Sequence, residues 1–126
     1  MKKVLLLCAV TTLTAFAQGN NEWFGFAPYA GARQLCNQVV MGQPGGAIVE
    51  IHWRSYATSD GMAKVIAFYE KQVKNVEKNP DSITFRLDKD TTLSVQAGTS
   101  SGYPKCDTKP KSDEKTVIVV SRATRR

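Results

Sequence analysis

The sequence predicts an α+β fold in which an antiparallel sheet of about five strands carries one helix across one face. Three observations predict it. A run with strand alternation at residues 47–58 precedes a segment with helical periodicity at 59–78, and three shorter strand-like runs follow. Turn-forming residues separate most of these runs, which favours hairpins and therefore antiparallel pairing. The predicted order is β-β-α-β-β-β.

The first two strands are predicted at residues 36–41 and 47–58, with a hairpin across the turn signal Gly42-Gln43-Pro44-Gly45-Gly46. The second strand alternates, with Val49, Ile51, Trp53, Ser55 and Ala57 on one face and Glu50, His52, Arg54 and Tyr56 on the other. A period of two is typical of a half-buried strand. We therefore expect the face that carries His52 to be a polar, outward-facing stripe.

The helix is predicted over residues 59–78, SDGMAKVIAFYEKQVKNVEK. Ser59 or Asp60 can cap its first turn, and Asn79-Pro80 is expected to end it. The apolar side chains that share one face are Met62, Val65, Ile66, Tyr69, Val73 and Val76, while Lys64, Lys71, Lys74 and Lys78 share the opposite face. Such a stripe predicts a helix that covers the sheet.

Two short alternating runs, 83–87 and 93–97, are joined by Asp88-Lys89-Asp90, which predicts a hairpin. The sequence TVIVVS at 116–121 is β-branched and predicts the last strand. Between these runs, residues 98–114 are rich in Gly, Ser, Pro, Asp and Lys and are too many for a simple turn. We assign residues 35–122 to one α+β domain and residues 123–126 to a basic tail.

The N-terminal residues 1–17 have the layout of a secretory signal peptide. Lys2 and Lys3 precede an apolar run, and the small-x-small sequence Ala15-Phe16-Ala17 predicts cleavage after Ala17. The apolar run is shorter than the roughly 20 residues that a membrane-spanning helix needs, so we expect export to the periplasm or the outside of the cell, with no transmembrane span. Residues 18–34 then form an irregular, aromatic and glycine-rich entry segment.

The composition fits one small, mildly basic domain. Removal of residues 1–17 from the 126-residue chain leaves 109 residues, which suits a single core. The loss of Lys2 and Lys3 lowers the net charge from +6 to +4. This charge favours contact with anionic surfaces, and it is too small to predict a dedicated nucleic-acid-binding protein.

Two cysteines, Cys36 and Cys106, remain after that cleavage, since Cys8 lies in the signal peptide. An even number in an exported protein predicts a structural disulfide. Two alternatives are a pair of free thiols and a redox pair, although catalytic pairs usually lie close together as Cys-x-x-Cys.

Nothing in the sequence predicts a catalytic site, a metal site or a cofactor. His52 is the only histidine, and zinc sites combine several Cys, His or carboxylate ligands. A general base or metal ligand is the alternative interpretation of His52, because Glu50 and Arg54 share its strand face. Neither a Gly-x-Ser-x-Gly elbow nor a glycine-rich phosphate signature is present.

Two features suggest a binding surface. The lysine face, with Lys64, Lys71 and Lys74, is either a solvated helix face or a contact for anionic lipid, polysaccharide or nucleic acid. Phe68 lies beside the apolar stripe, so it either packs under the entry segment or the 98–114 loop, or borders a groove where a ligand or partner docks.

The segments Pro28-Tyr29-Ala30-Gly31-Ala32 and Thr58-Ser59-Asp60, followed by Val65-Ile66-Ala67-Phe68-Tyr69, resemble those of a family of small exported bacterial α+β proteins, many of them lipoproteins. In that family a Pro-x-x-Gly-Ala entry precedes a strand, and a V-x-x-F-Y helix follows. The resemblance covers roughly residues 27–121 and implies an architecture but no catalytic residues. This chain lacks the small residue that a lipidated cysteine needs before Cys8.

The sequence therefore predicts an exported, non-enzymatic domain that acts by surface binding, with a cell-envelope protein or an anionic surface as its partner. One alternative is an enzyme or small-ligand carrier that uses the groove between helix and sheet near His52. A second is a binder of anionic polymers that uses the lysine face, for which affinity should fall steeply with salt.

Overall fold

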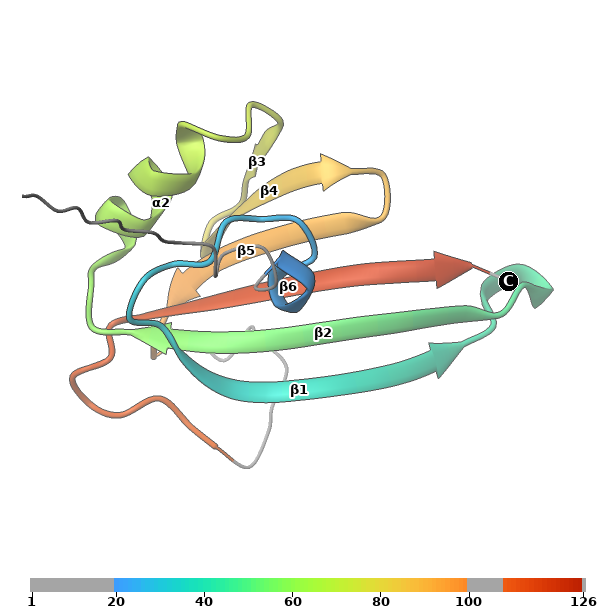
Figure 1. The fold of residues 1–126 in the computed structure, drawn as a ribbon, viewed down its shortest axis with the longest axis horizontal. Helices are drawn as coiled ribbons and strands as arrows, with labels where there is room; N and C mark the ends of the chain where they lie inside the picture. Colours follow the sequence, from blue (N-terminus) through green and yellow to red (C-terminus); the bar gives the residue numbers. More distant parts are fainter. Residues whose placement is uncertain (1–19, 100–107, 126) are drawn as a thin grey trace, which may run out of the picture.

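The structure, a computed structural model, describes residues 20–99 and 108–125. Its elements are η1 (Asn20–Trp23), β1 (Arg33–Gly42), η2 (Pro44–Gly46), β2 (Val49–Thr58), α2 (Met62–Glu70), β3 (Val76–Lys78), β4 (Ser82–Asp88), β5 (Thr91–Ala97) and β6 (Thr116–Arg125). The strands form one antiparallel sheet in the order β1-β2-β6-β5-β4-β3, and α2 lies against one face (Figure 1). The predicted fold class is confirmed, with one strand more than expected.

Strands β1 and β2 form the hairpin that the glycine-rich turn predicts. Gly42 pairs with Val49 at its closed end. Gly45 and Gly46 have φ angles of 65° and 87°, a region that glycine enters without steric cost. The turn therefore depends on glycine at these two positions.

The helix is shorter than predicted. α2 begins after Gly61, which makes no side-chain cap, and ends at Glu70. The predicted cap was wrong because Asp60 is used elsewhere, as the acceptor of a 2.6 Å hydrogen bond from the Tyr29 hydroxyl. The predicted end was also wrong, because residues 76–78 form β3.

The Asn79-Pro80 signal belongs to a hairpin turn between β3 and β4. The backbone amide of Asn79 donates to the carbonyl of Ser82 at 2.9 Å. Val76 pairs with Phe85 across this hairpin. The strand therefore satisfies backbone groups at the edge of β4, and β-branched Val73 and Val76 favour extended chain more than helix.

The main core lies between the sheet and a cover made of α2 and the entry segment. Paired residues of adjacent strands share a face, and one such row across the sheet contains Tyr56, Ile118, Val95 and Ile83. Tyr69 and Val65 of α2 are fully buried against this face. A smaller cluster of Leu35, Ala57 and Val117 lies on the opposite face.

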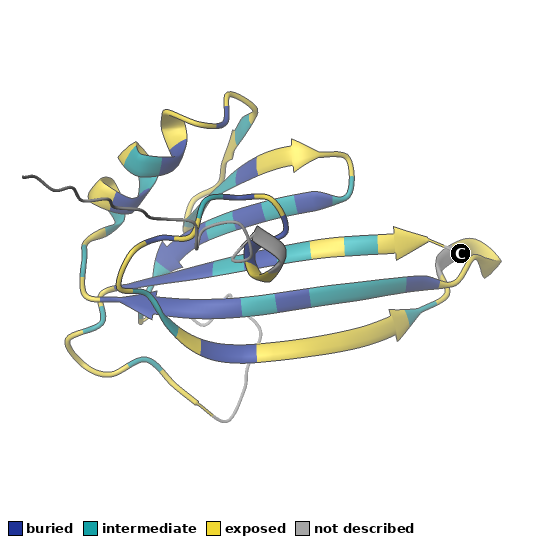
Figure 2. Ribbon diagram, in the orientation of Figure 1, coloured by how far each residue is buried: buried dark blue, intermediate teal, exposed yellow. Residues whose placement is uncertain are grey.

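The prediction that the His52 face of β2 is a polar stripe exposed to solvent is wrong. Tyr56, on the same face as His52 and Arg54, is only 4 % exposed and belongs to the main core. Both faces of β2 are covered near Thr58 (Figure 2). Alternation in the sequence established that the strand has two faces, but the aromatic cover comes from residues far away in the chain.

The described part of the entry segment packs on the sheet through its aromatic rings. Trp23, Phe24, Phe26 and Tyr29 are all buried. The Trp23 ring stacks on Tyr56, with 4.0 Å between ring centroids. Figure 1 shows this segment crossing the same face that α2 covers. Four aromatic side chains thus complete the core that one short helix leaves open.

The last strand is longer than predicted, so the expected basic tail at 123–126 is wrong for residues 123–125. β6 continues to Arg125 and pairs with β2 as far as Val49. The side chain of Arg125 forms an ion pair with Asp90, in the hairpin at 88–90 that the sequence predicts. Pairing with the long β2 strand gives these polar residues the backbone partners that their own composition does not indicate.

Candidate functional site

His52 lies against the entry segment. Its ring centroid is 6.0 Å from that of Phe24. Two guanidinium groups also lie over the Phe24 ring, Arg54 at 5.0 Å and Arg122 at 5.4 Å from the centroid. Cations at such distances are attracted to the face of an aromatic ring. His52, Arg54 and Arg122 therefore form the surface on which the Phe24 ring packs.

The same two arginines hold the backbone of the entry segment. Arg54 donates to the carbonyl of Glu22 at 2.7 Å, and Arg122 donates to the carbonyl of Phe24 at 2.8 Å. Phe24 has a φ angle of 54°, a left-handed conformation that is unfavourable for a bulky residue. The hydrogen bonds and ring contacts stabilise it. The space between cover and sheet near His52 is thus occupied by the chain's own aromatic side chains.

Phe68 is partly buried and packs against the main core. Its ring meets Tyr29 edge-on, with 5.2 Å between centroids, and meets Tyr69 at 4.9 Å. Such edge-to-face contacts are favourable arrangements for aromatic pairs. These contacts match the packing interpretation of Phe68, in which the ring lies beside the entry segment.

Tyr29 links the entry segment to the start of α2. Its hydroxyl donates to Asp60, and burial, followed by this hydrogen bond, raises the pKa of Tyr29 to about 12. The backbone carbonyl of Asp60 accepts a 2.6 Å hydrogen bond from Thr116. Asp60 thus ties the entry segment, the helix start and β6 together, which is a structural role.

The predicted lysine face does not form. Only Lys64 lies within α2, where it forms an ion pair with Asp60 at 3.7 Å. Lys71 is the residue that caps the end of the helix, and Lys74 lies beyond it, where its ammonium group donates to the Glu70 carbonyl at 3.4 Å. The three lysines are therefore spread over a helix and the connection to β3, because the chain leaves the helix at Glu70.

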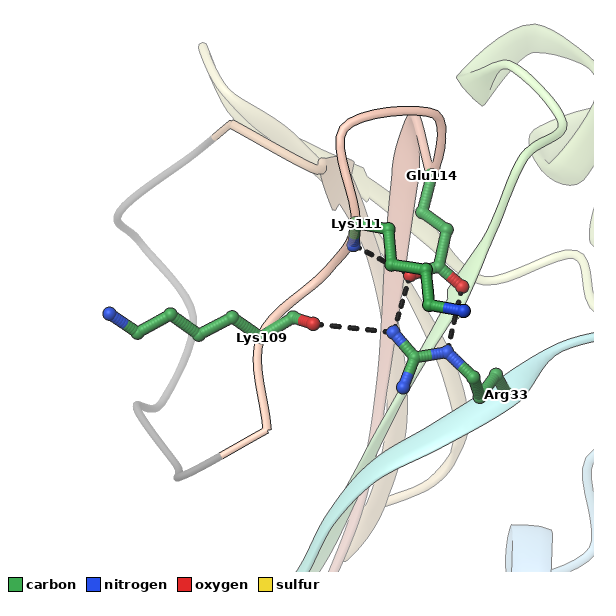
Figure 3. A network of polar contacts seen from close by, with 4 residues as sticks. All are labelled: Arg33, Lys109, Lys111 and Glu114. Atoms are coloured by element: carbon green, nitrogen blue, oxygen red, sulfur yellow. Dashed lines mark hydrogen bonds and ion pairs between the residues drawn. The ribbon is translucent and has the colours of Figure 1, made fainter.

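Hydrogen bonds attach the end of the 98–114 loop to the start of β1. Arg33 donates two hydrogen bonds to the Glu114 carboxylate, at 3.0 and 2.5 Å, and a third to the Lys109 carbonyl at 3.2 Å (Figure 3). The backbone amide of Lys111 also donates to Glu114, at 2.7 Å. The bond from Arg33, the largest cause, lowers the pKa of Glu114 to about 2.

Substitution Glu114→Gln is expected to remove a pH-dependent part of the stability. Because the pKa of Glu114 is lower in the folded chain, its contribution is present above about pH 4.5 and is lost as the pH falls toward 2. The pair is near the surface, so we expect a difference of about 1 kcal/mol at pH 7. Urea unfolding of both proteins between pH 7 and pH 2 measures it. The control Glu77→Gln removes a carboxylate at an exposed position in β3 and should change the stability little. A constant difference between Glu114→Gln and the parent protein at every pH would contradict the assignment.

Cys36 lies in β1, three residues after Arg33. It is 4 % exposed and has an interaction partner. Cys106 is outside the described residues, so its pairing with Cys36 stays a prediction. Figure 3 shows Lys109, Lys111 and Glu114 beside Arg33, at the start of β1.

The exposed apolar surface is concentrated at one end of the β1–β2 hairpin. The large hydrophobic side chains exposed in the described residues are Val39, Val40, Met41, Ile48 and Leu87. The first four lie around one end of the β1–β2 hairpin, with Val39 and Met41 on one face of β1 and Val40 on the other, and we call them the β1 edge patch. Met41 is the most exposed, at 58 %. Figure 2 shows the corresponding exposed stretch along β1. Beside it, Met41, Gly42, Gln43 and Ile48 line a shallow open hollow of about 390 Å³.

The β1 edge patch is the candidate site, and it is not among the binding surfaces that the sequence predicts. The signal was present, since residues 39–41 are three consecutive apolar residues in a predicted strand without a charged neighbour. A buried central strand gives the same pattern, so the sequence could not distinguish an exposed edge from an interior strand. The strand order provides that distinction.

Within residues 20–99 and 108–125, no helix is long and apolar enough to cross a membrane, and no group of three or more His, Cys, Asp or Glu side chains could hold a metal ion. Comparison with known proteins adds no further assignment: the chain matches no family model, and it has no significant match among curated proteins or solved structures.

Proposed function

We propose that this protein is an exported, non-enzymatic binding domain that engages its partner through the β1 edge patch. One observation carries the proposal. Four of the five large hydrophobic side chains exposed in the described part of the chain belong to this patch. Exposed apolar side chains that gather at one edge of a sheet are typical of an interaction site.

The contacts of β1 with the rest of the molecule hold the strand that carries this patch in place. β1 is paired with β2 along its whole length, with one bulge between Gln34 and Cys36. Arg33 holds the start of β1 through Glu114. An edge strand held in this way offers backbone donors and acceptors to an added strand, as in strand-addition complexes, while its side chains supply apolar contacts.

We also propose a disulfide between Cys36 and Cys106. It follows from the proposed export, because exported proteins reach compartments in which disulfides persist. Its geometric support comes from Arg33, which contacts the carbonyl of Lys109 at 3.2 Å. Cys36 lies three residues after Arg33, and Cys106 lies three residues before Lys109. At about 3.3–3.6 Å per extended residue, segments this short allow the two cysteines to approach each other. The bridge would attach β1 to this loop at a second point, in addition to Arg33.

Photocrosslinking in the producing cells tests the proposal. A benzophenone amino acid replaces Met41 in one variant and Leu87, which is 42 % exposed on β4, in a matched control. We expect the Met41 position to give discrete adducts in the exported fraction and the Leu87 position to give none. No adducts at position 41, or the same adducts at both positions, would contradict the proposed site.

A further inference from the structure

The two edges of the sheet differ in a way that indicates how the protein associates. β3, at one edge, is three residues long and carries Glu77 and Lys78. β1, at the other edge, is ten residues long, and its only charged residue is Arg33. Short edges with charged side chains prevent strand addition, whereas long uncharged edges favour it. Only the β1 edge lacks this protection.

The part of β1 that follows the bulge is regular. From Cys36 to Gly42 each residue has a partner in β2 without a register shift. In an antiparallel ladder the peptide groups of alternate residues point away from the paired strand. Residues 37–41 are all exposed, so their outward peptide groups are accessible together with the side chains of Val39, Val40 and Met41.

We propose that the partner of this edge is a second copy of the chain, which pairs β1 with β1 antiparallel about a two-fold axis; this rests on the proposed function of the β1 edge patch. An antiparallel pair of identical strands satisfies two-fold symmetry, so each copy uses the same surface. The exposed run 37–41 is centred on Val39. A register centred there places Val39 opposite its own copy and Met41 opposite Asn37 of the second copy.

Charge favours this edge over other surfaces of the chain as the place where two copies meet. The chain carries a net charge of +6, or +4 without Lys2 and Lys3, so two copies repel one another over most of their surfaces. Residues 36–42 contain no charged side chain, and an antiparallel pairing of this run brings no like charges into contact across the new ladder. Electrostatic repulsion between two copies is therefore weakest at the β1 edge, where backbone groups are also exposed.

The same asymmetry limits the assembly to a dimer. Once the two β1 edges are paired, the outer edges of the continuous sheet are two copies of β3. These are short and charged, so the sheet does not extend further. The pairing involves about seven residues of each chain, fewer than a standard interface of 20–30 residues a side. We therefore expect a concentration-dependent dimer rather than an obligate one.

Sedimentation velocity of the purified protein over a range of concentrations tests this proposal. We expect the parent protein to shift from monomer to dimer mass as its concentration rises. Val39→Lys places two like charges opposite each other and should weaken association at least tenfold. The matched control Leu87→Lys adds the same charge at an exposed apolar position of β4 and should dimerise like the parent protein. A parent protein that stays monomeric at millimolar concentration would overturn the proposal, as would equal dimerisation of Val39→Lys.

Hydrogen exchange of the parent protein provides a second measurement that does not depend on the folding of a variant. The outward-pointing amides among residues 36–42 should gain protection as the concentration rises, while those of β3 should not. Protection at β3 alone would overturn the proposal.

The crosslinking experiment separates this inference from the proposed function. An adduct of Met41 at twice the chain mass supports both. Adducts with a different protein, together with a monomeric parent protein, would leave the proposed site standing and overturn the inference. Absence of adducts together with a monomeric protein would contradict both.

Discussion

Replacement of Tyr69 by alanine is expected to lower the free energy of unfolding by about 3–5 kcal/mol, the range for truncation of a buried aromatic side chain. Tyr69 is fully buried. Its ring contacts four other rings, those of Phe26, Tyr29, Phe68 and Phe85. Its removal would leave a cavity between α2, the entry segment and the sheet. Denaturant unfolding, followed by circular dichroism, measures the loss.

Two further variants divide this effect into its parts. The Tyr69 hydroxyl donates a 2.7 Å hydrogen bond to the Ala27 carbonyl, so Tyr69→Phe should cost only about 1–2 kcal/mol. Phe68→Ala removes a neighbouring ring that is partly exposed and should cost less than Tyr69→Ala. If Tyr69→Ala were as stable as Tyr69→Phe, the ring would not be the centre of the core, and this account of the fold would be wrong.

Loss of the predicted bridge between Cys36 and Cys106 is expected to lower the free energy of unfolding by about 4 kcal/mol, on the chain-entropy account of a long closed loop. Cys36→Ser, Cys106→Ser and the double variant should be almost equally destabilised, because each change removes the same bond. Unfolding in denaturant without reductant measures all three.

Reduction provides the control for the bridge. Dithiothreitol should lower the stability of the parent protein to that of the variants and should leave the variants unchanged. Non-reducing peptide mapping should recover a linked peptide that contains both residues. A parent protein whose stability is insensitive to reductant would show that the two cysteines act independently, and the loop would then be attached by contacts such as those of Arg33 with Glu114 and Lys109.

The sequence determined the parts of the fold that depend on neighbouring residues. Alternation in residues 49–58 established β2, and Gly45 with Gly46 established its hairpin. The apolar stripe that includes Val65 and Tyr69 established which side of α2 is buried. Each of these signals involves residues within one or two turns or along one strand, so local conformational preferences determine it.

Pairing between distant segments decided the rest. Residues 76–78 joined β4 as a strand although their apolar spacing also suited a helix, because strand pairing satisfies backbone groups that a longer helix would leave open at that edge. Residues 123–125 joined β6 for the same reason, although their composition suggested a tail.

The candidate site also depended on the tertiary structure. His52 and Arg54 were predicted to face solvent, but Phe24 comes to lie over both of them. Val39 and Met41 were predicted in a strand, but only the strand order places that strand at an edge. The exposure of a side chain depends on what the rest of the chain brings against it. A sequence pattern specifies the two faces of a strand, and only the assembled sheet specifies which face and which edge remain accessible to a partner.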